Sequence, residues 1–133
     1  MHDLETAHGL LIMAGKDLRV LEILAAAEEF PEEAFGFHAQ QAVEKTLKAW
    51  LALNGHEPPR THSLRILIIS LEKCGEDVSD LWDFAELSPF SVQFRYETFP
   101  GIESSLDCME LMQKVQKLVE RVEGRRQSLE QGT

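Results

Sequence analysis

The sequence predicts an all-α fold, an up-and-down bundle of four long or medium helices with one or two short ones. Three observations support this prediction. In several long segments apolar residues recur every three or four positions, which is the period of a helix that buries one face. No segment alternates between apolar and polar side chains as a strand does, and the breaks between the helical segments are short. Short breaks between long helices are typical of antiparallel neighbours in a bundle.

The size and composition of the chain indicate one ordinary domain, residues 1–133, with a polar tail at 125–133 that is expected to fray. A chain of 133 residues buries about two-thirds of the surface that its unfolded form exposes. The longest apolar runs, such as residues 66–69, are far shorter than the roughly 20 residues of a membrane span. The N-terminus also lacks the basic region of a signal peptide. We therefore expect a cytoplasmic protein that has no membrane partner.

The charge and the ligand-type residues exclude several classes of function. A net charge of −10 argues against general DNA binding, because binding along phosphates requires a cationic face. The histidines share no metal spacing, and Cys74 and Cys108 are expected to be unlinked thiols, so no metal site and no cofactor are predicted. The last helical segment is locally basic. Because the helix dipole favours cations near a C-terminus, a solvated helix face is the favoured interpretation of its cations, which are Lys114, Lys117, Arg121, Arg125 and Arg126.

Two long helices are predicted in the first half of the chain. The first covers residues 4–29, in which apolar positions from Leu4 to Ala25 share one face. Pro31 and the two glutamates after it begin the second helix, since proline suits a first turn and carboxylates meet the positive end of the dipole. Asn54-Gly55 ends it. Its apolar stripe consists of Phe35, Ala39, Val43, Leu47, Trp50 and Leu51, and its polar edge consists of Gln40, Gln41, Glu44, Lys45 and Lys48.

Shorter helices are predicted in the second half. A rigid connector at 57–60, which contains two prolines, precedes a helix over residues 64–73 that Thr61 or Ser63 can cap. A short helix is expected over residues 80–87.

After this short helix, Ser88-Pro89 repeats the combination of a cap and a proline, which indicates a further short helical piece from residue 90 to 95 or 96. The last helix is expected to open near Ser104 and Asp107, which have the spacing of a capping box. Its apolar face runs from residue 106 to 122.

Four side chains are candidates for chemistry at a site. His62 follows the rigid connector and His38 lies on the second helix. Each imidazole can transfer protons near neutral pH, or can form a local hydrogen bond that holds the structure. Arg95 is the lone base of an acidic, aromatic stretch, where it either forms a structural ion pair or presents its fork to a phosphate. Tyr96 can stack on a base or pack in the core.

These residues together resemble a known family. The segment from Phe37 to Ala49 (FHAQQAVEKTLKA), then Pro59 to Leu64 (PRTHSL), and then Phe94-Arg95-Tyr96, in that order, are similar to the HEPN domain family (higher eukaryotes and prokaryotes nucleotide-binding). The similarity extends from the first predicted helix to the last. It implies a bundle of four to five helices that is commonly a homodimer, often encoded beside a minimal nucleotidyltransferase as a toxin–antitoxin module.

The resemblance also implies candidate functions. Many members are metal-independent ribonucleases whose Arg-x4-6-His motif forms a composite site at the dimer interface, where the arginine steadies the phosphate and the histidine moves protons. No histidine follows Arg95 at that distance, so the catalytic pair does not carry over and the enzyme assignment leans toward none. The positions that do carry over are Arg95, His62, Gln40, Gln41, Lys45 and Lys48. The residues predicted to bind the ligand are Arg95, Tyr96, His62, His38, Gln41, Lys45 and Lys48.

Three functional hypotheses follow. The leading one is a dimeric module that binds a nucleotide or an RNA phosphate and acts with a minimal nucleotidyltransferase. The second is a metal-independent ribonuclease toxin that pairs Arg95 with a non-sequential histidine, His62 or His38. The third is a purely structural helical module that binds a partner, in which Gln40, Gln41, Lys45 and Arg95 form buried polar links between helices.

Overall fold

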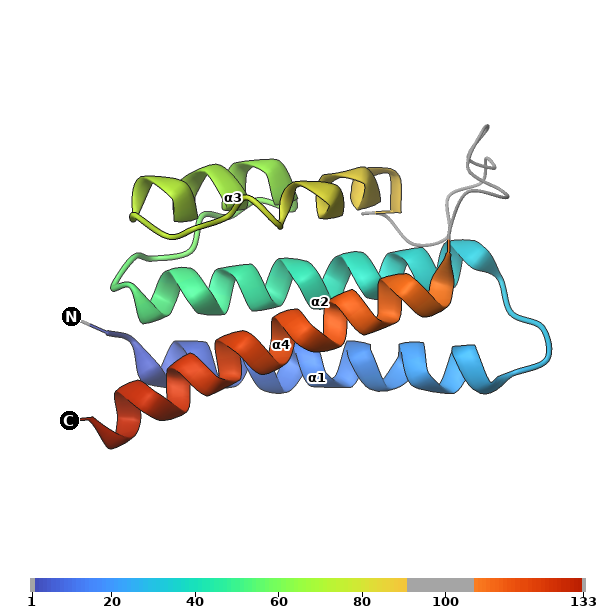
Figure 1. Ribbon diagram of the computed structural model, residues 1–133, viewed down its shortest axis with the longest axis horizontal. Coiled ribbons are helices and arrows are strands. Elements are labelled where there is room, and N and C mark those ends of the chain that lie inside the picture. Colours follow the sequence, from blue (N-terminus) through green and yellow to red (C-terminus); the bar gives the residue numbers. More distant parts are fainter. Residues whose placement is uncertain (1, 91–106, 133) are drawn as a thin grey trace.

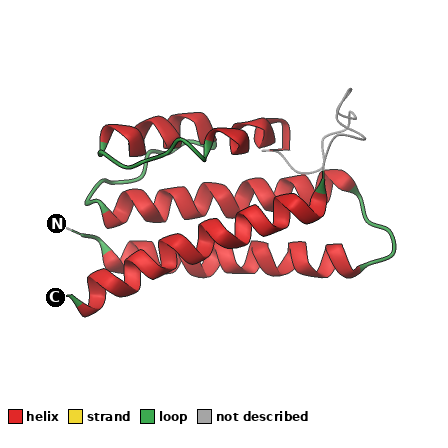
Figure 2. Cartoon of the chain, in the orientation of Figure 1, coloured by secondary structure: helices red, strands yellow, loops and turns green. Residues whose placement is uncertain are grey.

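The computed structural model describes residues 2–90 and 107–132 of the chain, and over these residues it contains helices and no strands (Figure 2). The elements are α1 (Leu4–Ala26), α2 (Glu32–Leu53), α3 (Leu64–Lys73), the 3₁₀ helix η1 (Trp82–Phe90) and α4 (Cys108–Gln131). α1 and α2 lie antiparallel, α4 crosses both of them obliquely, and α3 and η1 cover the other side of α2 (Figure 1). The predicted all-α bundle is therefore confirmed, with α2 in contact with every other described element.

The ends of α1 and α2 follow from capping. The side chain of Asp3 accepts a hydrogen bond from the backbone N–H of Thr6 at 3.0 Å and caps the start of α1. α1 ends at Ala26, three residues before the predicted end, because Ala27 adopts an extended backbone that begins the turn toward α2. Pro31 is the N-cap of α2, and the helix ends at Leu53, where Gly55 takes the positive φ of 77° that glycine tolerates.

Ser63, rather than Thr61, caps α3, since its hydroxyl accepts from the backbone N–H of Ile66. The predicted break at Ser88-Pro89 is wrong. The chain runs through it as the 3₁₀ helix η1 because the buried side chains there, Phe84, Leu87 and Phe90, are spaced by three, which matches three residues per turn. The helical piece predicted from residue 90 to 95 or 96 lies, after Phe90, outside the described residues.

Asp107 is the N-cap of α4 and accepts from the backbone N–H of Glu110 at 3.0 Å, while Ser104 lies outside the described residues. The helix continues to Gln131, through most of the tail for which fraying was predicted. Arg126 explains the difference, because its guanidinium pairs with Glu123 at 2.6 Å and Glu130 at 2.8 Å, one turn away on either side.

The core surrounds α2, which buries residues along most of its length. One cluster of buried apolar side chains joins all five elements, among them Leu21, Leu47, Leu67, Phe84 and Leu118. Gly36 lies against the ring of Phe90, so closely that a Cβ at position 36 would overlap that ring. The absence of a side chain at Gly36 therefore allows η1 to approach the first turns of α2.

Candidate functional site

A row of polar side chains runs along one edge of α2. Beside it lie one acid on α1 and one histidine from the segment between α2 and α3. We call this group the polar strip; it consists of Asp17, His38, Gln40, Gln41, Glu44, Lys45, Lys48 and His62. The α2 members recur at helical spacings of three and four, which places them along one edge. The sequence predicted this edge of α2 to be polar, and five of the seven predicted ligand-binding residues lie in the polar strip.

Asp17 joins α1 to α2 at the first half of the polar strip. Its carboxylate accepts from Nδ1 of His38 at 2.9 Å and from the ammonium of Lys45 at 2.7 Å. Only 11% of the Asp17 side chain is exposed, so burial of its charge is offset by two donors from α2. The sequence did not single out Asp17, because its partners lie 21 and 28 residues away.

Glu44 is the centre of the second half. Its side chain is 5% exposed, and its two oxygens accept from Gln40, His62 and Lys48, each at 3.1 Å. The amide of Gln40 also donates to the backbone carbonyl of His62 at 3.1 Å and accepts from Gln41 at 2.7 Å. The cluster therefore fixes the connector against α2, and one cation and one imidazole compensate the buried carboxylate.

His62 is held at one ring nitrogen and open at the other side. Its side chain is 74% exposed although Nδ1 lies against the carboxylate of Glu44. Because a carboxylate only accepts, Nδ1 carries the proton, and the neutral ring then keeps Nε2 as an acceptor. A carboxylate behind an imidazole fixes its orientation and tautomer, which is the arrangement that an acid–base or phosphate-binding histidine requires.

The geometry of the polar strip is compatible with a structural role for its residues and with a role in ligand binding. His62 ties the connector to α2, as the structural interpretation predicted, and it also exposes most of its ring. His38, Gln41, Lys45 and Lys48 are half-buried and form internal bonds. Arg95 and Tyr96 lie outside the described residues.

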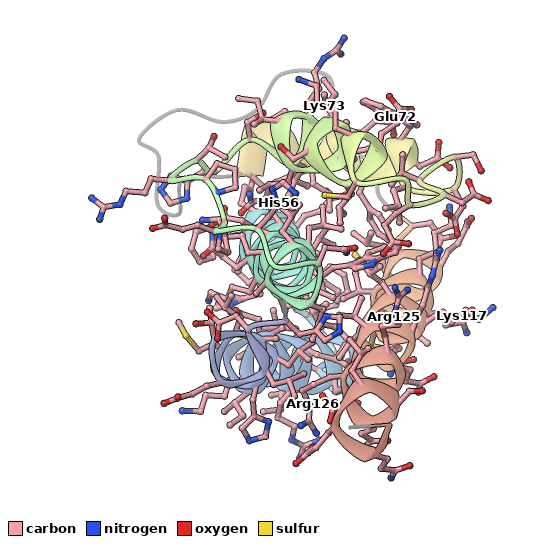
Figure 3. The ribbon with its side chains drawn as sticks, turned by 90° about the vertical axis from the view of Figure 1, so that its left-hand side faces the viewer. His56, Glu72, Lys73, Lys117, Arg125 and Arg126 are labelled. Atoms are coloured by element: carbon pink, nitrogen blue, oxygen red, sulfur yellow. The ribbon has the colours of Figure 1, made fainter. Side chains whose placement is uncertain are left out.

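The cations of α4 do not form an open basic face. Arg121 pairs with Asp80 at 3.3 Å and stacks on the ring of Trp50, and Arg125 lies 3.4 Å from Glu76. Figure 3 shows Arg125 and Arg126 on α4, with Lys117 pointing away from the bundle. The interpretation of this segment as an ordinary helix face, with its cations largely paired, therefore agrees with the structure.

Glu76, just after α3, is a half-buried anchor that the sequence did not reveal. Its carboxylate accepts from the indole of Trp50 at 2.8 Å and from the amide of Asn54 at 3.0 Å. Burial acts to raise the pKa of Glu76, but the hydrogen bonds from Asn54 and Trp50, with the charges of Arg125 and Arg121, outweigh it and lower that pKa below its ordinary value.

Over the described ranges 2–90 and 107–132, no group of three or more histidine, cysteine, aspartate or glutamate side chains is arranged to hold a metal ion. The same ranges contain no helix with the length and apolar character needed to cross a membrane.

The fold and the strip define a small helical bundle whose central helix carries a histidine–carboxylate network at one edge. The sequence profile of the HEPN domain family matches residues 7–125, which is most of the chain. The protein belongs to the HEPN domain family. Comparison with curated proteins and with solved structures gave no significant match.

Proposed function

We propose that this HEPN domain binds a nucleotide or an RNA phosphate with the solvent-facing side of the polar strip. The observation that carries the proposal is the pair formed by Glu44 and His62, in which a buried carboxylate holds an imidazole whose ring is mostly exposed. The ammonium of Lys48 lies on the same carboxylate. When a bound phosphate is accompanied by a proton on Nε2, the imidazolium and the neighbouring ammonium both offer charge-assisted donors, which are the groups that bind phosphate oxygens most strongly.

The remaining predicted ligand-binding residues have complementary chemistry. Arg95 supplies a planar fork that suits two phosphate oxygens, and Tyr96 supplies a ring on which a base can stack. In this proposal they complete the site that His62 begins. Gln41, which donates to Gln40, orders the amide that holds the backbone of His62.

We also propose the assembly in which the domain acts, a homodimer in the cytoplasm that is paired with a minimal nucleotidyltransferase in a toxin–antitoxin-like system. Membership of the HEPN family supports this assembly. The outer face of α1 supports it too, because it exposes the large apolar side chains of Ile12, Met13 and Ile23, which a partner subunit can cover.

Calorimetric titration with ATP, GTP, AMP and short RNAs tests the binding. His62→Ala and Arg95→Ala should each weaken binding at least tenfold, whereas Lys16→Ala, on the exposed surface of α1, should leave it unchanged. No heat with any of these ligands would contradict the proposal. A loss of stability in Gln41→Ala, with no binding in any form of the protein, would then favour the purely structural module.

A second candidate function, metal-independent cleavage of RNA, is favoured by the same Glu44–His62 pair. Nε2 of His62 can accept the proton of a ribose 2′-hydroxyl while Glu44 stabilises the imidazolium that forms, and Arg95 would steady the phosphate. Cleavage of structured RNA in the presence of a chelator, lost in both His62→Ala and Arg95→Ala, would establish it. Undiminished cleavage by both variants would rule out this mechanism.

A further inference from the structure

An open pocket lies between the start of α1 and the connector that follows α2, at the end of the bundle that faces the viewer in Figure 3, where His56 is labelled. Its volume is about 820 Å³, and we call it the connector pocket. Residues that line it include Thr6, Leu10, Lys48, His56, Pro59 and Arg60. Apart from Lys48, none of these belongs to the polar strip.

The connector pocket contains basic side chains that form few hydrogen bonds or ion pairs with other described residues. Arg60 is exposed and makes no ion pair with any residue in the described part of the chain. The ring of His56 is likewise exposed. Lys48 donates one hydrogen bond to Glu44 and has two further N–H donors. An arginine fork, an ammonium and an imidazole in one hollow are the donors that a phosphate group requires.

The same pocket also holds acids, and these narrow the type of ligand. Asp3 and Glu57 line it, so its fixed charges nearly balance and a bare anion gains little there. Asp3 is engaged in capping α1 through the backbone of Thr6. A ligand that fits both the basic and the acidic side chains carries a phosphate, which binds the cations, and hydroxyl groups, which donate to a carboxylate. A nucleotide with its ribose has both.

The apolar wall completes the match to a nucleotide. Leu10, Pro58 and Pro59 line one part of the pocket, and their flat or aliphatic surfaces suit the face of a base. The volume lies within the range of roughly 300–1,000 Å³ that is usual for small-molecule sites. The pocket is thus sized for one nucleotide rather than for a strand.

We infer that the connector pocket binds a nucleoside monophosphate, with its phosphate at Arg60 and Lys48 and its base on the proline wall. This inference rests on the proposed function, since it names a ligand class and adds a second place for it beside the polar strip. Arg60 and His56 are ligand-binding residues that the sequence did not suggest, because the residues that line the pocket come from three separate segments.

Calorimetric titration of the full chain with AMP and GMP tests the inference, with adenosine and inorganic phosphate as partial ligands. At least one monophosphate should bind, and both partial ligands should bind at least tenfold more weakly. Arg60→Glu should weaken binding of the monophosphate at least tenfold, while the matched charge reversal Lys117→Glu on α4 should not change it. Thr6→Trp should block the pocket, while Lys16→Trp on the exposed surface of α1 should not.

Parallel titrations with a short RNA and His62→Ala separate this inference from the proposed function. If RNA binding depends on His62 while no monophosphate binds, or binds without regard to Arg60 and Thr6, the connector pocket is not a nucleotide site and the polar strip still is. If monophosphate binding depends on Arg60 and Thr6 while His62→Ala changes neither titration, the pocket is the site and the strip is not. Absence of all binding overturns both.

Discussion

The indole nitrogen of Trp50 donates to a carboxylate oxygen of Glu76 at 2.8 Å, and this bond joins the end of α2 to the turn after α3. The same oxygen accepts from Asn54 and lies 3.4 Å from Arg125 of α4. One half-buried carboxylate therefore connects three elements at the end of the bundle. Its removal should loosen the contacts among these three elements.

Glu76→Gln should lower the free energy of unfolding at pH 7 by about 1–2 kcal/mol, because the amide keeps the shape but not the charge that strengthens these hydrogen bonds. The contribution depends on pH in a defined sense. The pKa of Glu76 in the folded protein lies below its ordinary value of 4.5, so the stabilisation is complete above about pH 4.5 and is lost as the pH falls through the lowered folded pKa.

Urea unfolding of the wild type and of Glu76→Gln between pH 7 and pH 3 measures this contribution to stability. The difference in the free energy of unfolding between the two proteins should be constant near neutrality and should shrink in acid. Glu72→Gln is the matched control, because Glu72 is exposed on α3 and should show no difference (Figure 3). A Glu76→Gln curve parallel to that of the wild type at every pH would contradict the role of this carboxylate.

Gly36→Ala should destabilise the protein by roughly 1–3 kcal/mol, because the added methyl group overlaps the ring of Phe90. Gly9→Ala is the control on the same scale. A Cβ at Gly9 meets nothing within 4 Å, so that substitution should stabilise α1 by about 0.5–1 kcal/mol. Thermal unfolding followed by circular dichroism distinguishes the two variants by their melting temperatures. Equal changes in melting temperature would show that Phe90 does not limit the residue at position 36.

Asp17→Asn should lower the free energy of unfolding by roughly 1.5–3 kcal/mol. The substitution weakens the hydrogen bonds that the largely buried carboxylate accepts from His38 and Lys45. A double-mutant cycle with Lys45→Met should show a coupling free energy of about 1 kcal/mol or more. Arg19→Gln, which removes an exposed ion pair from the same helix, should change stability by less than about 0.5 kcal/mol. Additive effects in the cycle would mean that the bond between Asp17 and Lys45 contributes nothing.

Glu44→Ala should destabilise the bundle by about 3–5 kcal/mol, because Lys48 and Gln40 lose a buried acceptor. Glu44→Gln should destabilise the bundle less than Glu44→Ala does. In the wild type, nitrogen NMR should find the neutral ring of His62 protonated at Nδ1, and in Glu44→Gln that preference should weaken. A ring protonated at Nε2 in the wild type would show that Glu44 does not set the tautomer.

Local signals in the sequence predicted the helices well. Pro31, Ser63 and Asn54-Gly55 act at the ends of helices through caps or a positive φ, and each of these effects depends on a few consecutive residues. The prediction was wrong where tertiary packing decides. η1 passes through Pro89 because Phe90 fits against Gly36, which lies more than 50 residues earlier in the chain.

The candidate site was predicted only in part for a related reason. Helical spacing placed Gln41, Lys45 and Lys48 on one edge, and the chemistry of imidazole made His38 and His62 candidates. Spacing cannot reveal that Asp17 turns toward that edge, nor that Glu44 is buried beneath it, because both facts depend on how α1 and the connector pack on α2. The partners of a buried carboxylate are a property of the tertiary structure.

Lys48 is shared by two neighbouring regions, since its ammonium compensates the buried charge of Glu44 and its side chain lines the connector pocket. An anion that binds this ammonium in the pocket therefore weakens the hydrogen bond from Lys48 to Glu44. The carboxylate then depends more on its contact with His62. Thermodynamic linkage makes such an effect reciprocal. Whatever occupies the pocket then alters the contact between Glu44 and His62, and a change in that contact alters in turn the affinity of the pocket.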